Sequence, residues 1–381
     1  MDFCVTEEQE VLRDSTLEFA KQELNAGLPE RDHAREFSHE NWKKCAEFGI
    51  QGLPMPTCYG GTEHDMLSVV LALEGLGRGC KDNGLLFALS AQMWSVQVPI
   101  LNFASAALKE RFLPKLINGE MIGGHAVTEP GSGSDVFSLR TAARRDGDSY
   151  VLNGQKTFVT SAPLASVFLV LATVDPAKGA GGLTAFLVER NTPGLRVSGH
   201  FEKMGLRTTQ LAEVFLDDCR IPAENILGRE GGGSAVFNCA MEWERAFILV
   251  PALGTMQRLL DECIKYATIR KQFGVPIGKN QAVANKIVEM QLRLETARLL
   301  AYRTAWLKSR KRRLTLEPSE VKLHLSESWV QCCLDAMQIH GGSGYIVETG
   351  IERELRDSLS SKLYSGTSEI QKVIIARYLG L

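Results

Sequence analysis

Residues 149–160 read SYVLNGQKTFVT, a short segment rich in β-branched and aromatic residues that marks a change of structural class along the chain. Such a composition is typical of β structure. Asp146-Gly147 just before the segment and Asn153-Gly154 inside it are dipeptides typical of tight turns. Four further segments have a similar composition: GGHAVTEP (123–130), SVFLVLATV (166–174), LTAFLVER (183–190) and AEVFLDDCRIP (212–222). We therefore predict a central β domain.

Helical sequence precedes this β block. Thr6 and Gln9 form a capping-box pattern, and apolar residues then recur at helical spacing. Similar stretches continue through NWKKCAEFG, where a glycine closes the run, and through DMLSVVLALEGLGRG and ASAALKERFLPKLING. The first third of the chain is therefore predicted to be helical.

Helical spacing returns after Gly231-Gly232-Gly233, with helices expected around 234–265, 282–312 and 316–340. The order is helices, strands, helices, without βαβ alternation and without repeats. We therefore predict an α+β multidomain protein. Its parts are an N-terminal helical domain at 1–120, a central β domain at 121–228 and a C-terminal helical bundle at 229–381.

The bulk composition excludes several classes of protein. The 381 residues carry 43 basic and 45 acidic side chains, so a net charge of -2 draws the chain neither to nucleic acid nor to an anionic membrane. Apolar runs such as VFLVLATV are shorter than the roughly 18 residues of a membrane span, and the N-terminus does not resemble a signal peptide. Nine scattered cysteines without a CxxC pair predict reduced thiols and a cytoplasmic location. Histidines without HxH or HExxH spacing predict no metal site.

Two glycine-rich segments have more than one interpretation. TEPGSGSDV (128–136) lacks the third glycine of a dinucleotide fingerprint, because Val136 stands there, so a Rossmann site is excluded. The segment is either a simple loop or a place where backbone N–H groups approach a phosphate or heterocycle. QIHGGSGY (338–345) either ends a helix or offers backbone donors to an anion.

Two charged segments also leave alternatives open. KSRKRR (308–313) is either a solvated connection between helices, which we favour, or a surface for an acidic partner. MEWERA (241–246) holds Glu242, Glu244 and Arg245 in a helical context, and taken alone these are expected to be surface charges.

Five dispersed motifs, TEPGSGSD, LNGQKTFVT, IRKQFG followed by Gln281, QIHGGSGY and RDSLSSKLYSGTSEIQ, resemble those of the acyl-CoA dehydrogenase flavoproteins in order and spacing over essentially the whole chain. The resemblance implies an N-terminal helical domain, a central β-barrel or sandwich domain and a C-terminal four-helix bundle. It also implies FAD as cofactor, and a homotetramer in which one subunit completes the FAD site of another.

The resemblance implies two groups of cofactor contacts. Residues expected beside the flavin are Thr128, Gly133, Ser134, Phe158, Thr160 and, in the late turn, Thr367. Residues expected to reach the FAD of a neighbouring subunit are Arg270, Phe273, Gln281, Gln338, Gly341 and Gly342. Phe158 stands where the family often has tryptophan, so stacking is kept while an indole hydrogen bond is lost.

The resemblance also raises a question about the catalytic base. Many family members carry a glutamate in the turn that here reads Tyr364-Ser365-Gly366-Thr367, and a serine hydroxyl is too weak a base for this task. Some members, including isovaleryl-CoA dehydrogenases, carry the glutamate on a bundle helix just before an arginine, and Glu244 followed by Arg245 matches that pattern. We therefore expect Glu244 to be the base, with Arg245, Tyr364 and Ser365 at the substrate, and the Ser365 backbone N–H on the thioester oxygen.

The resemblance predicts FAD-dependent α,β-dehydrogenation of an acyl thioester. Within the family the chain is most similar to members that oxidise prolyl groups on carrier proteins in secondary metabolism, and Glu242 is a candidate contact for a ring ammonium. The alternative substrate is a short- or branched-chain acyl-CoA. Oxygen or an electron-transfer flavoprotein would accept the electrons. A flavin-binding or interaction protein without catalysis, holding an acidic partner through KSRKRR, is the alternative of another class.

Overall fold

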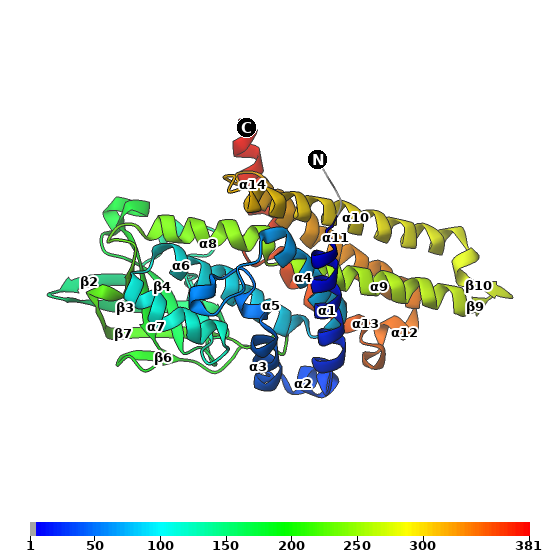
Figure 1. Cartoon of the computed structure of the whole chain (residues 1–381), viewed down its shortest axis with the longest axis horizontal. Helices are drawn as coiled ribbons and strands as arrows, with labels where there is room; N and C mark the ends of the chain where they lie inside the picture. The colour runs from blue at the N-terminus through cyan, green and yellow to red at the C-terminus, as the bar shows by residue number, and fades with distance from the viewer. Residues whose placement is uncertain (1–4) are drawn as a thin grey trace.

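A computed structural model describes residues 5–381. Figure 1 shows β2 and the β9–β10 hairpin at opposite ends of the long axis, with helix α8 along the β-rich end and the long helices α9 and α10 toward the other. The three predicted kinds of structure follow in the expected order, and the α+β fold class is confirmed.

The N-terminal part is helical. Its helices are α1 Glu7–Glu23, α2 Leu28–Ala34, α3 His39–Phe48, α4 Met66–Gly79, α5 Asn83–Gln92, α6 Val98–Phe103 and α7 Ala106–Ile117. The capping box at the start of α1 is confirmed, because the Thr6 hydroxyl accepts from Gln9 N and the Gln9 side chain accepts from Thr6 N. Gly49 ends α3 with a φ of 97°, a conformation that favours glycine.

The apolar run of α5 and α6 is longer than the sequence analysis recognised. A π-helical turn at Met93–Gln97 joins the two helices, so that Asn83–Phe103 is helical over 21 residues. By length and composition alone this segment would suffice to cross a membrane, but 83% of its most apolar window is buried inside the protein. It is therefore a core helix of this fold, and it carries residues of the site described below.

The central domain contains eight strands in one sheet, in the order β6-β7-β3-β2-β4-β5-β8, with β1 paired in parallel to β4. The strands are β1 Gly123–Ala126, β2 Ala142–Asp146, β3 Ser149–Thr160, β4 Val167–Thr173, β5 Leu183–Glu189, β6 Leu195–Val197, β7 Leu211–Pro222 and β8 Ile226–Leu227. Along β4, Phe168, Val170 and Ala172 point into a core within the β domain, while the alternate residues pack with the helices. The sheet is thus buried on both faces here.

One of the two predicted turns is confirmed and the other is wrong. Asp146 pairs with Ser149 across a tight turn in which Gly147 has a φ of 61°. Asn153-Gly154 instead lies within β3, where the register against β7 shifts between Leu152 and Gly154. A Cβ on Gly154 would lie 2.5 Å from Thr141 Oγ1, so the glycine serves close packing at a β-bulge.

The C-terminal part returns to helices. They are α8 Gly233–Phe247, α9 Val250–Ile269, α10 Gln281–Ser309, α11 Glu317–His340, α12 Gly342–Tyr345, α13 Ile351–Leu359 and α14 Ser368–Tyr378, with the hairpin β9 Lys271–Gln272 and β10 Val275–Pro276 after α9. The expected single helix at 234–265 is wrong, because the chain breaks between α8 and α9 just before Pro251, which lacks an N–H and fits the first turn of a new helix. Helix α11 packs against α8, α9, α10, α13 and α14.

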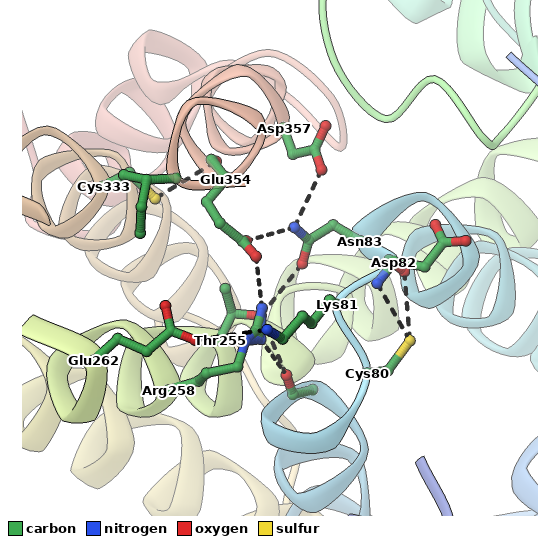
Figure 2. A network of polar contacts seen from close by, with 12 residues as sticks. Cys80, Lys81, Asp82, Asn83, Thr255, Arg258, Glu262, Cys333, Glu354 and Asp357 are labelled. Carbon is green, nitrogen blue, oxygen red and sulfur yellow. Dashed lines mark hydrogen bonds and ion pairs between the residues drawn. The ribbon is translucent and has the colours of Figure 1, made fainter. Parts of the chain in front are cut away.

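A buried polar network joins the domains (Figure 2). Asn83 Nδ2 on α5 donates to Glu354 Oε2 at 2.7 Å and to Asp357 Oδ2 at 3.1 Å on α13. Arg258 Nη2 on α9 donates to Glu354 Oε1 at 2.7 Å. Asp357 Oδ1 accepts from Leu206 N of the β domain at 2.5 Å, and burial raises the pKa of Asp357 to about 7. The network fixes α5 and α13, the two helices that precede the site residues Ser95 and Tyr364.

Candidate active site

Glu244 lies on the inner face of α8 and is only 8% exposed. The interpretation of this glutamate as a surface charge is therefore wrong. Ser95 lies in the π-helical turn between α5 and α6, and its Oγ donates to Glu244 Oε1 at 2.5 Å. Burial raises the pKa of Glu244 to about 7, while the Ser95 hydrogen bond, the Arg245 charge and the Ser365 hydroxyl act in the opposite direction. A carboxyl with this pKa is partly protonated and partly ionised at neutral pH, so it can take up or release a proton there.

The turn before α14 brings Ser365 to the same place. Ser365 has a φ of 56° and Gly366 a φ of 86°, and Gln371 Nε2 holds both by donating to Ser365 O at 3.1 Å and to Gly366 O at 2.9 Å. Thr367 Oγ1 caps α14 by accepting from Ile370 N at 3.3 Å. The Ser365 side chain lies close enough to Glu244 to affect its pKa. Positions 244 and 365, one on a helix and one in a turn, thus converge.

Tyr364 forms one wall of the site. Its ring packs against Phe87 with centroids 4.5 Å apart, and burial together with the nearby Glu244 and Asp357 carboxyls raises the pKa of its hydroxyl. A cavity of about 20 Å³ lies beside Tyr364 and is lined by Phe87, Ile248, Leu249 and Trp329 among others.

An aromatic cluster lies on the two helical segments that carry Glu244 and Ser95. Trp94 and Trp243 stack with centroids 5.7 Å apart, and Phe247 packs on both rings. Lys308 Nζ lies 4.2 Å from the centroid of the Trp243 ring and forms an ion pair with Glu242. The carboxylate of Glu242 is therefore already neutralised by a lysine, which argues against the expected contact with a ring ammonium.

Two cationic side chains, Arg245 and Lys322, lie close enough to Glu244 for their charges to act on it. Arg245 is half-buried, and its Nε has no hydrogen-bond partner among residues 5–381. Lys322 on α11 is fully buried, its Nζ also lacks a partner in that part of the chain, and burial lowers its pKa to about 8. Sequence reasoning missed Lys322, Ser95 and Gln371, because nothing in their local pattern distinguishes them from ordinary helical residues.

Five of the six residues predicted beside the flavin, Thr128, Gly133, Ser134, Phe158 and Thr160, lie on the β domain, whereas Thr367 lies in the turn before α14. Thr157 N donates to Thr128 O at 2.8 Å, which joins the TEPGSGSD loop to β3 beside Phe158. Phe158 is 61% exposed, has a φ of 54°, and packs its ring on Phe201 with centroids 5.5 Å apart. An exposed aromatic ring held in a strained backbone conformation is characteristic of a binding site.

The glycines of this loop are consistent with a bound heterocycle or phosphate. A Cβ on Gly131 or Gly133 would meet no atom of the chain within 4 Å, so internal packing does not require glycine there. Ser134 is exposed and Thr160 is half-buried on the same surface. Open backbone, exposed hydroxyls and a free aromatic face suit a flat heterocycle, and the donors present therefore fit a flavin.

The second group lies elsewhere. Arg270, Phe273, Gln281, Gln338, Gly341 and Gly342 are all exposed, and Phe273 is 98% exposed. They gather around the β9–β10 hairpin and the end of α11, and Figure 1 shows this hairpin at the end of the molecule opposite β2. Gly341 ends α11 with a φ of 59°, so the interpretation as a helix terminus is confirmed. One chain does not bring the two groups together.

The chain matches known proteins over nearly its full length. The N-terminal, middle and C-terminal domain models of acyl-CoA dehydrogenases match residues 6–120, 124–219 and 231–380. An L-prolyl-[peptidyl-carrier protein] dehydrogenase of Pseudomonas fluorescens is 44% identical over 92% of each chain. The crystal structure of the prolyl acyl carrier protein oxidase AnaB superposes with a TM-score of 0.98 at 50% identity over 99% of this chain and 100% of that one. PigA with FAD and proline superposes with a TM-score of 0.98 at 38% identity over 100% of both chains. The chain therefore belongs to the acyl-CoA dehydrogenase family.

Proposed function

We propose that this protein is an FAD-dependent enzyme that removes hydrogen from the α and β carbons of an acyl thioester, and that its substrate is a prolyl group on a carrier protein. One observation carries the chemistry: Glu244 is a buried carboxyl with a pKa of about 7 that lies beside Ser365. The names of the relatives support the substrate, since proteins 44% and 38% identical are L-prolyl-[peptidyl-carrier protein] dehydrogenases.

Glu244 is the base in this proposal. Its carboxylate removes the α-proton, and the dry, apolar surroundings that raise its pKa keep it basic enough to do so. The Ser365 backbone N–H makes no hydrogen bond among residues 5–381 and is the donor for the thioester oxygen, where negative charge develops. FAD, when bound, accepts the β-hydrogen as hydride. Trp94, Trp243 and Phe247 exclude water from the base.

The experiment that tests this function is an anaerobic titration of the purified holoprotein with prolyl-carrier protein and, in parallel, with isovaleryl-CoA. We expect the prolyl thioester to bleach the oxidised flavin. Bleaching by the CoA ester alone would replace the prolyl substrate with the acyl-CoA alternative. A colourless protein without flavin absorption would contradict the enzymatic proposal.

Ser95→Ala is expected to shift the pH profile of flavin reduction to the alkaline side. The hydroxyl of Ser95 donates to the ionised form of Glu244 and so lowers its pKa, which burial alone would hold higher. Without that donor, a smaller fraction of Glu244 is ionised at pH 7, so flavin reduction slows at pH 7 and recovers at higher pH. Ser90→Ala, which removes a buried hydroxyl without a partner from the same helix, is the matched control and should leave the profile unchanged. An unshifted profile in Ser95→Ala would contradict the role of Glu244.

We also propose that the second group of cofactor residues serves the FAD of a neighbouring subunit in a homotetramer. All six are exposed and lie away from the loop of Gly133. Val288, Leu292 and Leu299 of α10 are 64%, 58% and 52% exposed, and so large an apolar stripe is typical of a subunit interface.

Arg270→Ala is expected to weaken FAD binding by about 10- to 100-fold, because a charge-assisted hydrogen bond to a phosphate contributes about 1.5–3 kcal/mol. The measurement is the FAD dissociation constant after removal of free cofactor by dialysis. Lys265→Ala, which removes an exposed cation from the same helix α9, is the control. Equal FAD retention in both variants would contradict the assignment.

A further inference from the structure

The connection between α10 and α11 carries an unusual concentration of positive charge. Arg310, Lys311, Arg312 and Arg313 are all exposed, and none of them forms an ion pair within residues 5–381. The whole protein has a net charge of -2, so this loop, residues 310–313, is a local patch of the opposite sign. The sequence pattern predicts a solvated connection between helices, and residues 310–313 do connect α10 to α11 as an exposed loop, but a solvated loop does not require four consecutive cations.

The loop is fixed to the helix that carries the base. In Figure 1, α10 runs from the β9–β10 hairpin back toward α8 and α14. At its end, Lys308 forms an ion pair with Glu242 and lies over the Trp243 ring. Glu242 precedes Glu244 by two residues on α8, so these contacts hold the start of the loop against the helix that carries the base, on a different face of that helix from Glu244.

A second anchor comes from the N-terminal domain. Ser309 Oγ accepts from Met66 N at 3.0 Å and donates to Asp65 Oδ1 at 3.3 Å. Five residues beyond Lys308 span at most about 18 Å, because an extended chain advances no more than about 3.6 Å per residue. The backbone of loop 310–313 therefore lies within that distance of the backbone of Lys308, whose side chain contacts the helix of Glu244.

Positive charge also lies close to the base itself. Arg245 Nε and Lys322 Nζ have no partner among the described residues, and the charges of both side chains act on Glu244. A substrate with negative charge outside the site would meet the cations of loop 310–313 at the surface, while its neutral thioester would reach Glu244 near Arg245 and Lys322.

We propose that loop 310–313 is the docking surface for an acidic face of the carrier protein that delivers the acyl thioester, an inference that rests on the proposed function. A carrier protein holds its acyl group on a phosphopantetheine arm, so its body stays outside while the thioester reaches the base. The phosphodiester at the root of the arm adds a negative charge where the two proteins meet. Exposed Arg and Lys side chains act mainly by steering a partner of opposite charge and by orienting it.

Reversing two charges of the loop tests the proposal. For Arg312→Glu with Arg313→Glu, kcat/KM with prolyl-carrier protein is expected to fall by about 10- to 100-fold at low salt, within the range of electrostatic steering. The deficit should shrink as ionic strength rises, because exposed charges are screened. Prolyl-pantetheine, which lacks the carrier protein, should react at the same rate with the variant and with the parent.

A matched reversal, Arg144→Glu with Arg145→Glu, changes the net charge equally on β2, at the β-rich end of the molecule, and should leave the carrier reaction unchanged. An equal fall in this control would overturn the proposal in favour of an effect of overall charge. No fall in the loop variant would overturn it, and so would an equal fall with prolyl-pantetheine, which would place the loop at the arm or at the chemistry.

Binding of fluorescently labelled holo-carrier protein without an acyl group separates this proposal from the proposed function. Loss of binding in the loop variant, with binding kept in the β2 variant, supports docking even if the prolyl group is not oxidised. Equal binding by the parent and the loop variant overturns docking even if the prolyl group is oxidised.

Discussion

Glu244→Gln should slow flavin reduction by the substrate by at least about 10²-fold, the lower end of what loss of a general base costs. The amide is nearly isosteric and its oxygen still accepts from Ser95, so the fold and the FAD content should be kept. In the parent protein the rate should rise with pH up to about 7, where Glu244 becomes ionised, and this limb should vanish in the variant. Anaerobic stopped-flow absorbance at the flavin maximum, after FAD contents are matched, measures both effects.

Ser365→Ala is the comparison for this experiment. It removes the hydroxyl beside Glu244 but keeps the backbone N–H, so its effect on the rate should be small next to that of Glu244→Gln. Rapid flavin reduction by Glu244→Gln would contradict the assignment of the base. A large loss in Ser365→Ala alone would move the catalytic role to the serine hydroxyl.

The substitution Glu244→Gln should not destabilise the protein at alkaline pH. The folded-state pKa of Glu244 lies at about 7, above its unfolded value near 4.5, so between these values the folded protein holds a proton that the unfolded chain has released. Stability is therefore lost as pH rises through this window, because the unfolded state binds fewer protons. Glu244→Gln removes the titrating group, and its thermal midpoint relative to the parent should improve from pH 5 to pH 8.

Lys156→Met should lower the free energy of unfolding by about 3–5 kcal/mol, the cost of leaving one member of a buried ion pair without its partner. Lys156 is fully buried, and its Nζ donates to Glu129 Oε1 at 2.8 Å and to Val127 O at 2.9 Å. The Glu129 carboxylate also accepts from the backbone N–H groups of Arg140 and Thr141. Because Glu129 lies in the TEPGSGSD loop, the variant should also lose FAD.

Urea unfolding of the FAD-free proteins measures this effect without the contribution of cofactor binding. Lys178→Met is the control, since the Lys178–Asp175 pair has a similar length, 3.1 Å, but lies on the surface. Exposed pairs contribute about 0–1 kcal/mol. Equal losses in the two variants would show that burial does not determine the strength of the Lys156–Glu129 pair.

The sequence alone determined the features that depend on neighbouring residues. The capping box of Thr6 and Gln9, the turn at Asp146-Gly147, the end of α11 at Gly341 and the order of helical and β-rich parts are all set within a few residues of chain. Capping, turn conformations and hydrophobic spacing act at that range, so they can be recognised without the fold. The resemblance to the acyl-CoA dehydrogenases, and not the local pattern, pointed to Glu244 as the candidate base, since MEWERA taken alone predicts surface charges.

Tertiary structure decided what those residues experience. Asn153-Gly154 became part of a strand because Asn153 pairs with Ala142 of β2 and Gly154 pairs with Leu216 of β7, and the predicted helix at 234–265 divided at the start of α9. Glu244 owes its pKa to burial and to Ser95, a residue 149 positions away in the chain. Its proximity to Ser365 depends on Gln371, which fixes the turn. Desolvation and hydrogen bonds between distant segments exist only once the chain has folded, so the family resemblance of the sequence names the base while the packed interior sets its chemistry.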